Sequence, residues 1–461
     1  MLPHRSRSGL CRLAATPLFA LIAAVASAAV PEGYEVLTRL TSLNGPERRQ
    51  ASKEIVAAKD LSVVAGIVDA LFFVPSRFRL DLYETLEKLT GEKRTRSYAD
   101  WVEYVGAHTE VTPRPGYVTW KLSLFERIDS RYNRIFYPGA PAKIRVEEVV
   151  WGGVPLDGIP SLDSPVIIPA EKAGYLSDDE PVFGVSLGGE QRAYPVRHLS
   201  WHEMANDEVG GEPITLSYCT LCGSAILYSS RTPNGNRYVF GTSGLLYRSN
   251  KLMYDRQSLS LWSNLTGEPV IGRLANTNAR LAQLPITRIR WGEWLRRFPK
   301  TTVLALDQPD GRAAGFRYLP GAADRARHGV RFPVWQKSDR LKRDTEVYAL
   351  RLGDRPKAYP LELLYTRRVV NDRLGEERLV LVADGASGAV RVYRAGGHRF
   401  SAGKAADQLE DETGAAWTLT EERLERPDGS AEPLPRVPGH IAFWFGWYGF
   451  YPQTEVYDGT P

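Results

Sequence analysis

The sequence predicts an α+β protein in which a small all-helical module precedes two tandem homologous domains with mostly antiparallel sheets. Three observations support this prediction. Apolar residues recur at helical spacing over residues 30–115. Residues 182–228 align without a gap onto residues 347–393. Within both aligned segments, short runs rich in β-branched and aromatic residues alternate with turn residues, which is typical of strands.

Residues 1–28 have the pattern of a secretory signal peptide. Arg5, Arg7 and Arg12 precede an apolar run, and small residues at 26–28 supply a cleavage site. We therefore expect a periplasmic or secreted protein. Removing three arginines and no acid lowers the formal net charge from +5 to +2, which gives no reason to expect a nucleic-acid partner. No later segment has about 18 consecutive apolar residues, so no membrane span is expected after cleavage.

The module at residues 30–115 is predicted to contain short helices packed as hairpins. Amphipathic runs at 49–59, 61–73 and 79–89 are separated by Gly and Pro. The module contains no cluster of residues that suggests chemistry. We expect it to serve packing or to face a protein partner.

The internal alignment predicts two copies of one domain, at 150–310 and 330–460. Without any gap, fourteen of the aligned positions at 182–228 and 347–393 are identical. A second block extends the match, because Trp291 and Trp294 fall on Trp444 and Trp447. Such self-similarity is the sequence signature of a duplicated unit.

Each copy has a predicted order of elements. In the first copy these are a strand at 182–187, a helix over 198–207, a strand at 214–218, strands at 225–228 and 238–240, and a helix at 291–298. This order places two cysteines directly after the strand at 214–218.

The two copies act as controls for one another. Residues that are identical in both copies are expected to have structural roles. Residues that occur in only one copy can have catalytic or binding roles. Asn206 and Asp207 recur as Asn371 and Asp372, so we expect them to have a turn or cap role.

The cysteines and their neighbours behave differently, because none of them recurs. Cys219 and Cys222 are the only two cysteines after the signal peptide. They align with Asp384 and Ser387, while His198, His202 and Glu203 align with Leu363, Arg367 and Arg368. The first copy is therefore expected to hold the functional centre, and the second to be a scaffold or lid.

The residue types favour a metal centre. Cys219 and Cys222 flank a turn that ends in Gly and lies between predicted strands, which resembles a metal knuckle. No second Cys-x-x-Cys exists, so His202 with either His198 or His440 would have to complete the site. Thiolate and imidazole ligands suit copper or zinc.

Two other interpretations of the pair remain open at this point. The pair could exchange with thiols as an oxidoreductase, with Cys219 as nucleophile and Cys222 as resolving cysteine. It could also be a structural disulfide in a non-catalytic scaffold, although so short a loop gains little chain entropy. In a metal enzyme, Glu203 would orient a ligand or carry protons.

Several short motifs lie at residues 193–195, 201–203, 206–207, 218–224, 240–244, 253–256, 260–263 and 443–454. Together these motifs resemble the DUF3179 family of uncharacterised domains. The resemblance covers roughly 150–460 and implies that His202, Glu203, Cys219 and Cys222 belong together. It includes no histidine at the position of His198, and it implies no particular reaction.

One further stretch of these motifs suggests contacts. Residues 241–244 are expected to form a small flexible turn that lets a ligand or backbone approach closely. Asp255 has an acidic counterpart before Trp417 in the second copy, so a structural role is expected for it. Arg256 has none and is a candidate for substrate contact.

Overall fold

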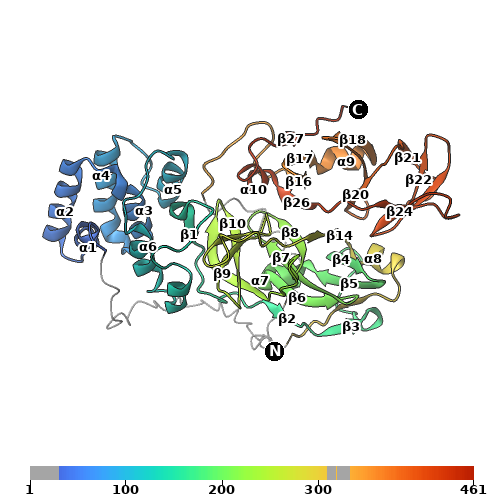
Figure 1. The fold of residues 1–461 in the computed structure, drawn as a ribbon, viewed down its shortest axis with the longest axis horizontal. Coiled ribbons are helices and arrows are strands. Elements are labelled where there is room, and N and C mark those ends of the chain that lie inside the picture. The colour runs from blue at the N-terminus through green and yellow to red at the C-terminus, as the bar shows by residue number, and fades with distance from the viewer. Residues whose placement is uncertain (1–30, 309–317, 319–332, 461) are drawn as a thin grey trace, which may run out of the picture.

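The computed structural model describes residues 31–308, 318 and 333–460, and it has an α+β architecture (Figure 1). A helical region lies at one end of the molecule, followed by several mostly antiparallel sheets. The predicted signal peptide lies outside the described residues. Within the described residues, no helix is long and apolar enough to cross a membrane.

The helical region extends beyond the predicted boundary at residue 115. Its helices are α1 (Glu35–Leu40), α2 (Gly45–Ala58), α3 (Val64–Phe73), α4 (Arg79–Thr90), α5 (Tyr98–Ala107) and α6 (Tyr117–Phe125). Helix α3 is central, because eight of its ten residues are buried. Lys121 of α6 is buried beside it, and its Nζ donates to Asp69 Oδ1 over 2.8 Å. The additional helix therefore belongs to the core of this region.

The first group of sheets, which we call the upstream unit (residues 149–304), contains the predicted strands around the cysteines. Its central elements are β4 (Pro181–Leu187), β5 (Glu190–Pro195), α7 (Val196–His202), β6 (Met204–Val209), β7 (Glu212–Cys219) and β8 (Ser224–Ser229). Strands β6, β7 and β8 pair antiparallel. The helix expected over 198–207 is correct only at its start. The chain leaves the helix at Glu203, whose φ of 57° is left-handed, and continues as β6.

A separate sheet of the upstream unit lies beside the sheet of β6, β7 and β8, and Asn206 of β6 bonds to Phe240 in it. It comprises β1 (Val149–Trp151), β9 (Phe240–Tyr247), β10 (Asn250–Asp255), β11 (Leu261–Ser263) and β12 (Pro269–Ile271). The turn expected at 241–244 is wrong, because these residues lie inside β9. Close backbone approach does occur at Gly244, where an added Cβ would lie 2.0 Å from the carbonyl oxygen of Val154.

The upstream unit is completed by short elements. These are β2 (Leu162–Asp163), β3 (Ile167–Pro169), β13 (Gln283–Leu284), β14 (Thr287–Arg290), α8 (Trp291–Arg297) and β15 (Thr302–Leu304). Strand β14 pairs antiparallel with β4, and β15 pairs parallel with β5.

The downstream unit (residues 346–456) has the same order of elements. They are β16 (Glu346–Leu352), β17 (Arg355–Pro360), α9 (Leu361–Arg367), β18 (Val369–Leu374), β19 (Glu377–Asp384) and β20 (Ala389–Arg394). In the gapless alignment, each begins and ends at the position of its upstream counterpart. The unit ends with β26 (His440–Phe443), α10 (Trp444–Tyr448) and β27 (Glu455–Val456), and β26 and β27 pair with β16 and β17 as β14 and β15 pair with β4 and β5.

The downstream unit also contains a sheet of short strands. It comprises β21 (Phe400–Ala402), β22 (Gln408–Asp411), β23 (Ala416–Leu419), β24 (Arg423–Glu425) and β25 (Leu434–Pro435). In this sheet Asp411 accepts a hydrogen bond from Trp417 Nε1 over 3.0 Å. Asp255 accepts the matching bond from Trp262 Nε1 over 2.9 Å in the upstream unit, which gives Asp255 a structural role.

The shared asparagines are structural, although they lie in strands and not in turns or caps. The Asn206 side chain donates to the carbonyl of Phe240 and accepts from its N–H. Asn371 makes the same two bonds with Phe400. Asp207 and its counterpart Asp372 each accept a tyrosine hydroxyl over 2.7 Å. These residues hold neighbouring strands together.

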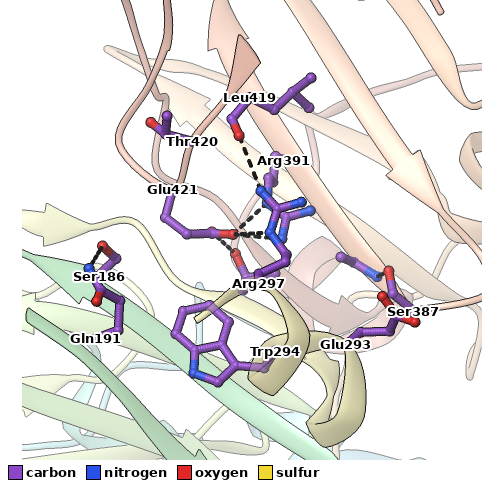
Figure 2. A network of polar contacts seen from close by, with 12 residues as sticks. Ser186, Gln191, Glu293, Trp294, Arg297, Ser387, Arg391, Leu419, Thr420 and Glu421 are labelled. Atoms are coloured by element: carbon purple, nitrogen blue, oxygen red, sulfur yellow. Dashed lines mark hydrogen bonds and ion pairs between the residues drawn. The ribbon is translucent and has the colours of Figure 1, made fainter. Parts of the chain in front are cut away.

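The two units contact each other through equivalent backbone hydrogen bonds. The N–H of Phe443 donates to the carbonyl of Cys222 over 2.8 Å, and the N–H of Arg290 donates to that of Ser387 over 2.9 Å. Near the second of these bonds lies a buried polar network in which Glu421 accepts hydrogen bonds from Arg391 of its own unit and from Thr287 of the upstream unit (Figure 2). Polar residues therefore hold this end of the interface, whereas the end at Cys222 is closed by apolar residues.

Candidate functional site

The two cysteines lie at the turn between β7 and β8. Cys219 ends β7, and Gly223 completes the turn with a left-handed φ of 65°. The two Sγ atoms are 2.6 Å apart, and the residues are 1% and 0% exposed. This separation approaches the roughly 2.05 Å of a disulfide bond. The turn thus holds two free thiols in position to join.

Polar groups surround the sulfur atoms. Asn250 Nδ2 donates to Cys222 Sγ over 3.0 Å, and the hydroxyl of Ser224 lies 3.3 Å from the same sulfur. Cys219 Sγ lies 3.9 Å from the carbonyl oxygen of Ser249. Ser249 ends the tight connection between β9 and β10, with a left-handed φ of 62°, and Asn250 begins β10. This connection therefore forms one wall of the site.

A buried lysine lies beneath the turn. Lys251 Nζ donates to the carbonyls of Glu203 and Tyr218 over 2.5 and 3.3 Å, and it lies 3.9 Å from Glu203 Oε2. Burial lowers the pKa of Lys251, while the charges of Glu203 and of both cysteines act in the opposite direction. Glu203 Oε1 also accepts from Thr220 Oγ1 over 2.9 Å, so Glu203 braces the cysteine turn.

The two thiols differ in acidity. Burial acts to raise the pKa of Cys219, but the hydrogen bond from Cys222 and the backbone N–H groups of Lys251 and Cys222 outweigh it, so the pKa is lowered. Burial and the proximity of Cys219 both raise the pKa of Cys222 well above its ordinary value. Cys219 is therefore the thiol that ionises first, with Cys222 donating to it.

Apolar residues close the site. Cys219 and Cys222 share one apolar cluster with Val334, Phe443 and Phe445, against which Leu221 is partly buried. Helix α10 lies so close that a Cβ added at Gly446 would lie 2.6 Å from Cys222 Cβ. The downstream part of the chain therefore covers the cysteines of the upstream unit.

The two predicted histidines of α7 have other partners. His202 Nδ1 lies 2.9 Å from the carbonyl oxygen of Pro160, and Nε2 lies 2.5 Å from the hydroxyl of Tyr318. His198 Nε2 lies 3.1 Å from the carbonyl oxygen of Ala305. Burial lowers the pKa of His198 to about 3. Both ring nitrogens of His202 thus face oxygen atoms and not the cysteine sulfurs.

His440 lies on β26 and is also buried, with 4% exposure. Neither ring nitrogen has a hydrogen-bond partner among the described residues. Burial lowers its pKa to about 4. In the described ranges, no three or more His, Cys, Asp or Glu side chains form a group that could hold a metal ion. The structure thus brings Glu203 to the cysteine turn but does not assemble the predicted cysteine–histidine ligand set.

Arg256 belongs to a different cluster. Its guanidinium lies 3.3 Å from both Asp157 Oδ2 and Asp163 Oδ2, and it donates to Ser161 Oγ over 2.9 Å. The side chain is 35% exposed. The structure therefore gives Arg256 local ion pairs and no contact with the cysteine turn.

Sequence reasoning missed three residues that touch the sulfurs or the turn. Asn250 and Lys251 lie within a buried strand, and Ser224 begins another. A signal was present, because Asn and Lys seldom occupy buried strand positions without partners. The identity of the partners of Asn250 and Lys251 was hidden, since these partners come from other strands that are distant in the sequence.

Comparison with known proteins now places the chain in a family. The family model described as "Protein of unknown function (DUF3179)" matches residues 156–454. The chain belongs to this family, whose matched region spans both sheet units and the cysteine turn. No curated protein matches the chain. No solved structure matches it.

Proposed function

We propose that Cys219 and Cys222 form a redox-active dithiol–disulfide pair in an exported protein. The observation that carries the proposal is the 2.6 Å separation of the two Sγ atoms. Two thiolates that hold a tetrahedral zinc ion lie farther apart, since each Zn–S bond is about 2.3 Å long. The separation therefore favours formation of a bond between the sulfurs.

The reaction is thiol–disulfide exchange with an external disulfide. The Cys219 thiolate attacks one sulfur of that disulfide, forms a mixed disulfide and releases one thiolate. The thiolate of Cys222 then attacks Cys219 Sγ, which releases the second thiolate and closes the protein disulfide. Two electrons pass from the pair to the external disulfide, and the proton from Cys222 goes to a released thiolate. An external dithiol reverses the process.

The surrounding residues support distinct roles. Asn250 and Ser224 offer hydrogen bonds to Cys222 Sγ, and these stabilise the charge when Cys222 becomes the attacking thiolate. Burial lowers the pKa of Lys251, and the negative charge of a cysteine thiolate acts to raise it, so thiolate formation favours the protonated lysine beneath the turn. Glu203 positions Lys251 and Thr220 and does not touch sulfur.

The test is the reduction potential of the pair. The purified protein is equilibrated with dithiothreitol redox buffers, and the thiols are trapped and counted. We expect a potential above roughly −270 mV, as in proteins that exchange disulfides. Cys219→Ser and Cys222→Ser should each abolish the transition, while Cys11 is absent from processed protein. A potential below about −300 mV, with no exchange against model thiols, would refute the proposal.

A second candidate is binding of a soft metal ion by the two thiolates. The observation that favours it is that both thiols converge within one buried turn. Copper(I) suits thiolates, whereas zinc prefers four ligands. Elemental analysis of the reduced protein distinguishes metal binding from thiol–disulfide exchange. One copper ion per chain, absent from the Cys222→Ser variant, would favour metal binding.

We further propose that the two units are tandem homologous copies of which only the upstream one kept the centre. The support is that six consecutive elements align without a gap and share the same strand pairing. Export rests on the signal-like pattern at 1–28. N-terminal sequencing of protein from the extracytoplasmic fraction tests export, and a start after Ala28 is expected.

A further inference from the structure

A cavity of about 370 Å³ lies between the two units, next to the cysteine turn. Tyr218 and Gly223 line it from the upstream unit, and His440 and Phe443 line it from the downstream unit. This volume is near the lower end of the range for small-molecule sites, which is roughly 300–1,000 Å³. It suits a small molecule and excludes a folded protein.

The cavity has largely apolar walls. Phe183, Ile441 and Phe443 supply apolar surface. His440 lines it from β26, but side chains alternate along the strand, and its imidazole packs against Trp447 with ring centroids 5.7 Å apart. The imidazole therefore lies on the opposite face of β26 from Ile441 and Phe443.

Ion pairs at the wall favour a ligand with both charges. Arg288 lies 2.6 Å from Glu346 across the two units, and these side chains are 28% and 30% exposed. Arg290 pairs with Asp179 over 3.0 Å. The cationic and anionic lining residues occur in pairs. A zwitterion can insert into such a pair, with its carboxylate on the arginine and its ammonium on the acidic residue, so that no charge is left without a partner.

Phe443 connects the cavity to the sulfurs. Its ring lines the cavity and also belongs to the apolar cluster around Cys219 and Cys222. It lies so close to Gly223 that a Cβ there would be 3.1 Å from the ring. The ring of Phe443 therefore lies between the cavity and the cysteine cluster.

We propose that the cavity binds a small zwitterionic disulfide of the amino-acid class, with its carboxylate on Arg288, and that this molecule is the oxidant of the cysteine pair. This inference rests on the redox function proposed above. One bound disulfide accepts two electrons and leaves as two thiols, while the cysteine pair becomes a disulfide.

The test uses L-cystine as the probe. The full processed chain carrying Cys219→Ser and Cys222→Ser is titrated with L-cystine by calorimetry, so that binding is measured without exchange. We expect saturable binding that Arg288→Ala weakens at least tenfold and that Arg288→Lys weakens less. Arg373→Ala, at an arginine that is 58% exposed and pairs only locally, is the matched control and should bind as the parent does.

A second measurement follows exchange in the protein with both cysteines. Phe443→Leu, which keeps an apolar side chain, should raise the rate of oxidation by L-cystine severalfold. Folded protein that binds no L-cystine up to the solubility limit of this amino acid, or equal weakening by Arg288→Ala and Arg373→Ala, overturns the inference. If such protein still exchanges with oxidised dithiothreitol, the redox function stands and the cavity assignment alone falls. Binding without any exchange would instead overturn the redox function and the role of the ligand as oxidant.

Discussion

Replacing Gly446 with Ala tests whether α10 of the downstream unit presses on the cysteines. A Cβ at this position would lie 2.6 Å from Cys222 Cβ and 3.6 Å from Cys222 Cα. The first distance is too short for two carbon atoms, so α10 or the turn must move. Overpacking of this kind costs about 1–3 kcal/mol.

Helix propensity acts in the opposite direction and makes the prediction decisive. Gly446 lies within α10, where Ala is favoured over Gly by about 1 kcal/mol. If nothing touched this position, Gly446→Ala would stabilise the protein. If the close contact dominates, the net cost is up to about 2 kcal/mol, and the melting temperature should fall by up to roughly 8 °C, at about 2–4 °C per kcal/mol.

Two measurements separate these outcomes. Calorimetry gives the melting temperature, and alkylation of the reduced protein gives the accessibility of the thiols. We expect a lower melting temperature and faster alkylation, because the moved helix uncovers Cys222. Gly397→Ala is the control, since an added Cβ there meets nothing within 4 Å. A melting temperature at or above the wild-type value, with unchanged alkylation, would refute the close packing of α10 on the site.

Three other substitutions test the electrostatics. Cys222→Ala removes the hydrogen bond that lowers the pKa of Cys219, so the pH profile of Cys219 alkylation should move to higher pH; an unmoved midpoint contradicts the assignment. Lys251→Met leaves the carbonyls of Glu203 and Tyr218 without this donor and should destabilise the protein by about 1–3 kcal/mol in denaturant titrations. Burial acts to raise the pKa of Glu421, but the charges of Arg391 and Arg436 outweigh this effect, so the pKa of Glu421 is lowered. Its stabilisation is therefore present above the unfolded pKa of about 4.3 and is lost as the pH falls below that value toward the lowered pKa of the folded state. Glu421→Gln should remove that acid dependence and cost about 3–5 kcal/mol at neutral pH; an acid-unfolding profile identical to the wild type would contradict this.

Local sequence patterns predicted where the cysteine turn lies in the fold. Its place between two strands follows from apolar runs at 214–218 and 225–228 and from Gly223. The face shared by His198 and His202 also follows from helical spacing. The end of that helix could not be predicted, because Glu203 adopts a left-handed φ that its residue type does not favour and no Gly or Pro marks the position.

The partners of these residues depend on tertiary contacts. Tyr318, which faces both histidines, lies far after them in the chain, and Phe443 and Gly446 lie still farther after the cysteines. Spacing in the sequence carries no information about such contacts. Residue type alone groups the histidines with the cysteines as metal ligands, whereas Asn250 and Lys251, which do approach the turn, are not typical ligands.

The two ends of the interface between the units differ in polarity. The backbone bond from Phe443 to Cys222 has an equivalent from Arg290 to Ser387. At the first, apolar rings exclude water from two thiols, which carry no charge when protonated. At the second, the aligned positions are Asp384 and Ser387, near the cluster of Arg391 and Glu421. A carboxylate is costly to bury in an apolar cover, so Asp384, which stands where Cys219 does, cannot take its place in such an enclosure. At the polar end, side-chain hydrogen bonds of 2.7 Å from Thr287 to Glu421 and from Arg436 to Thr287 join the two units instead.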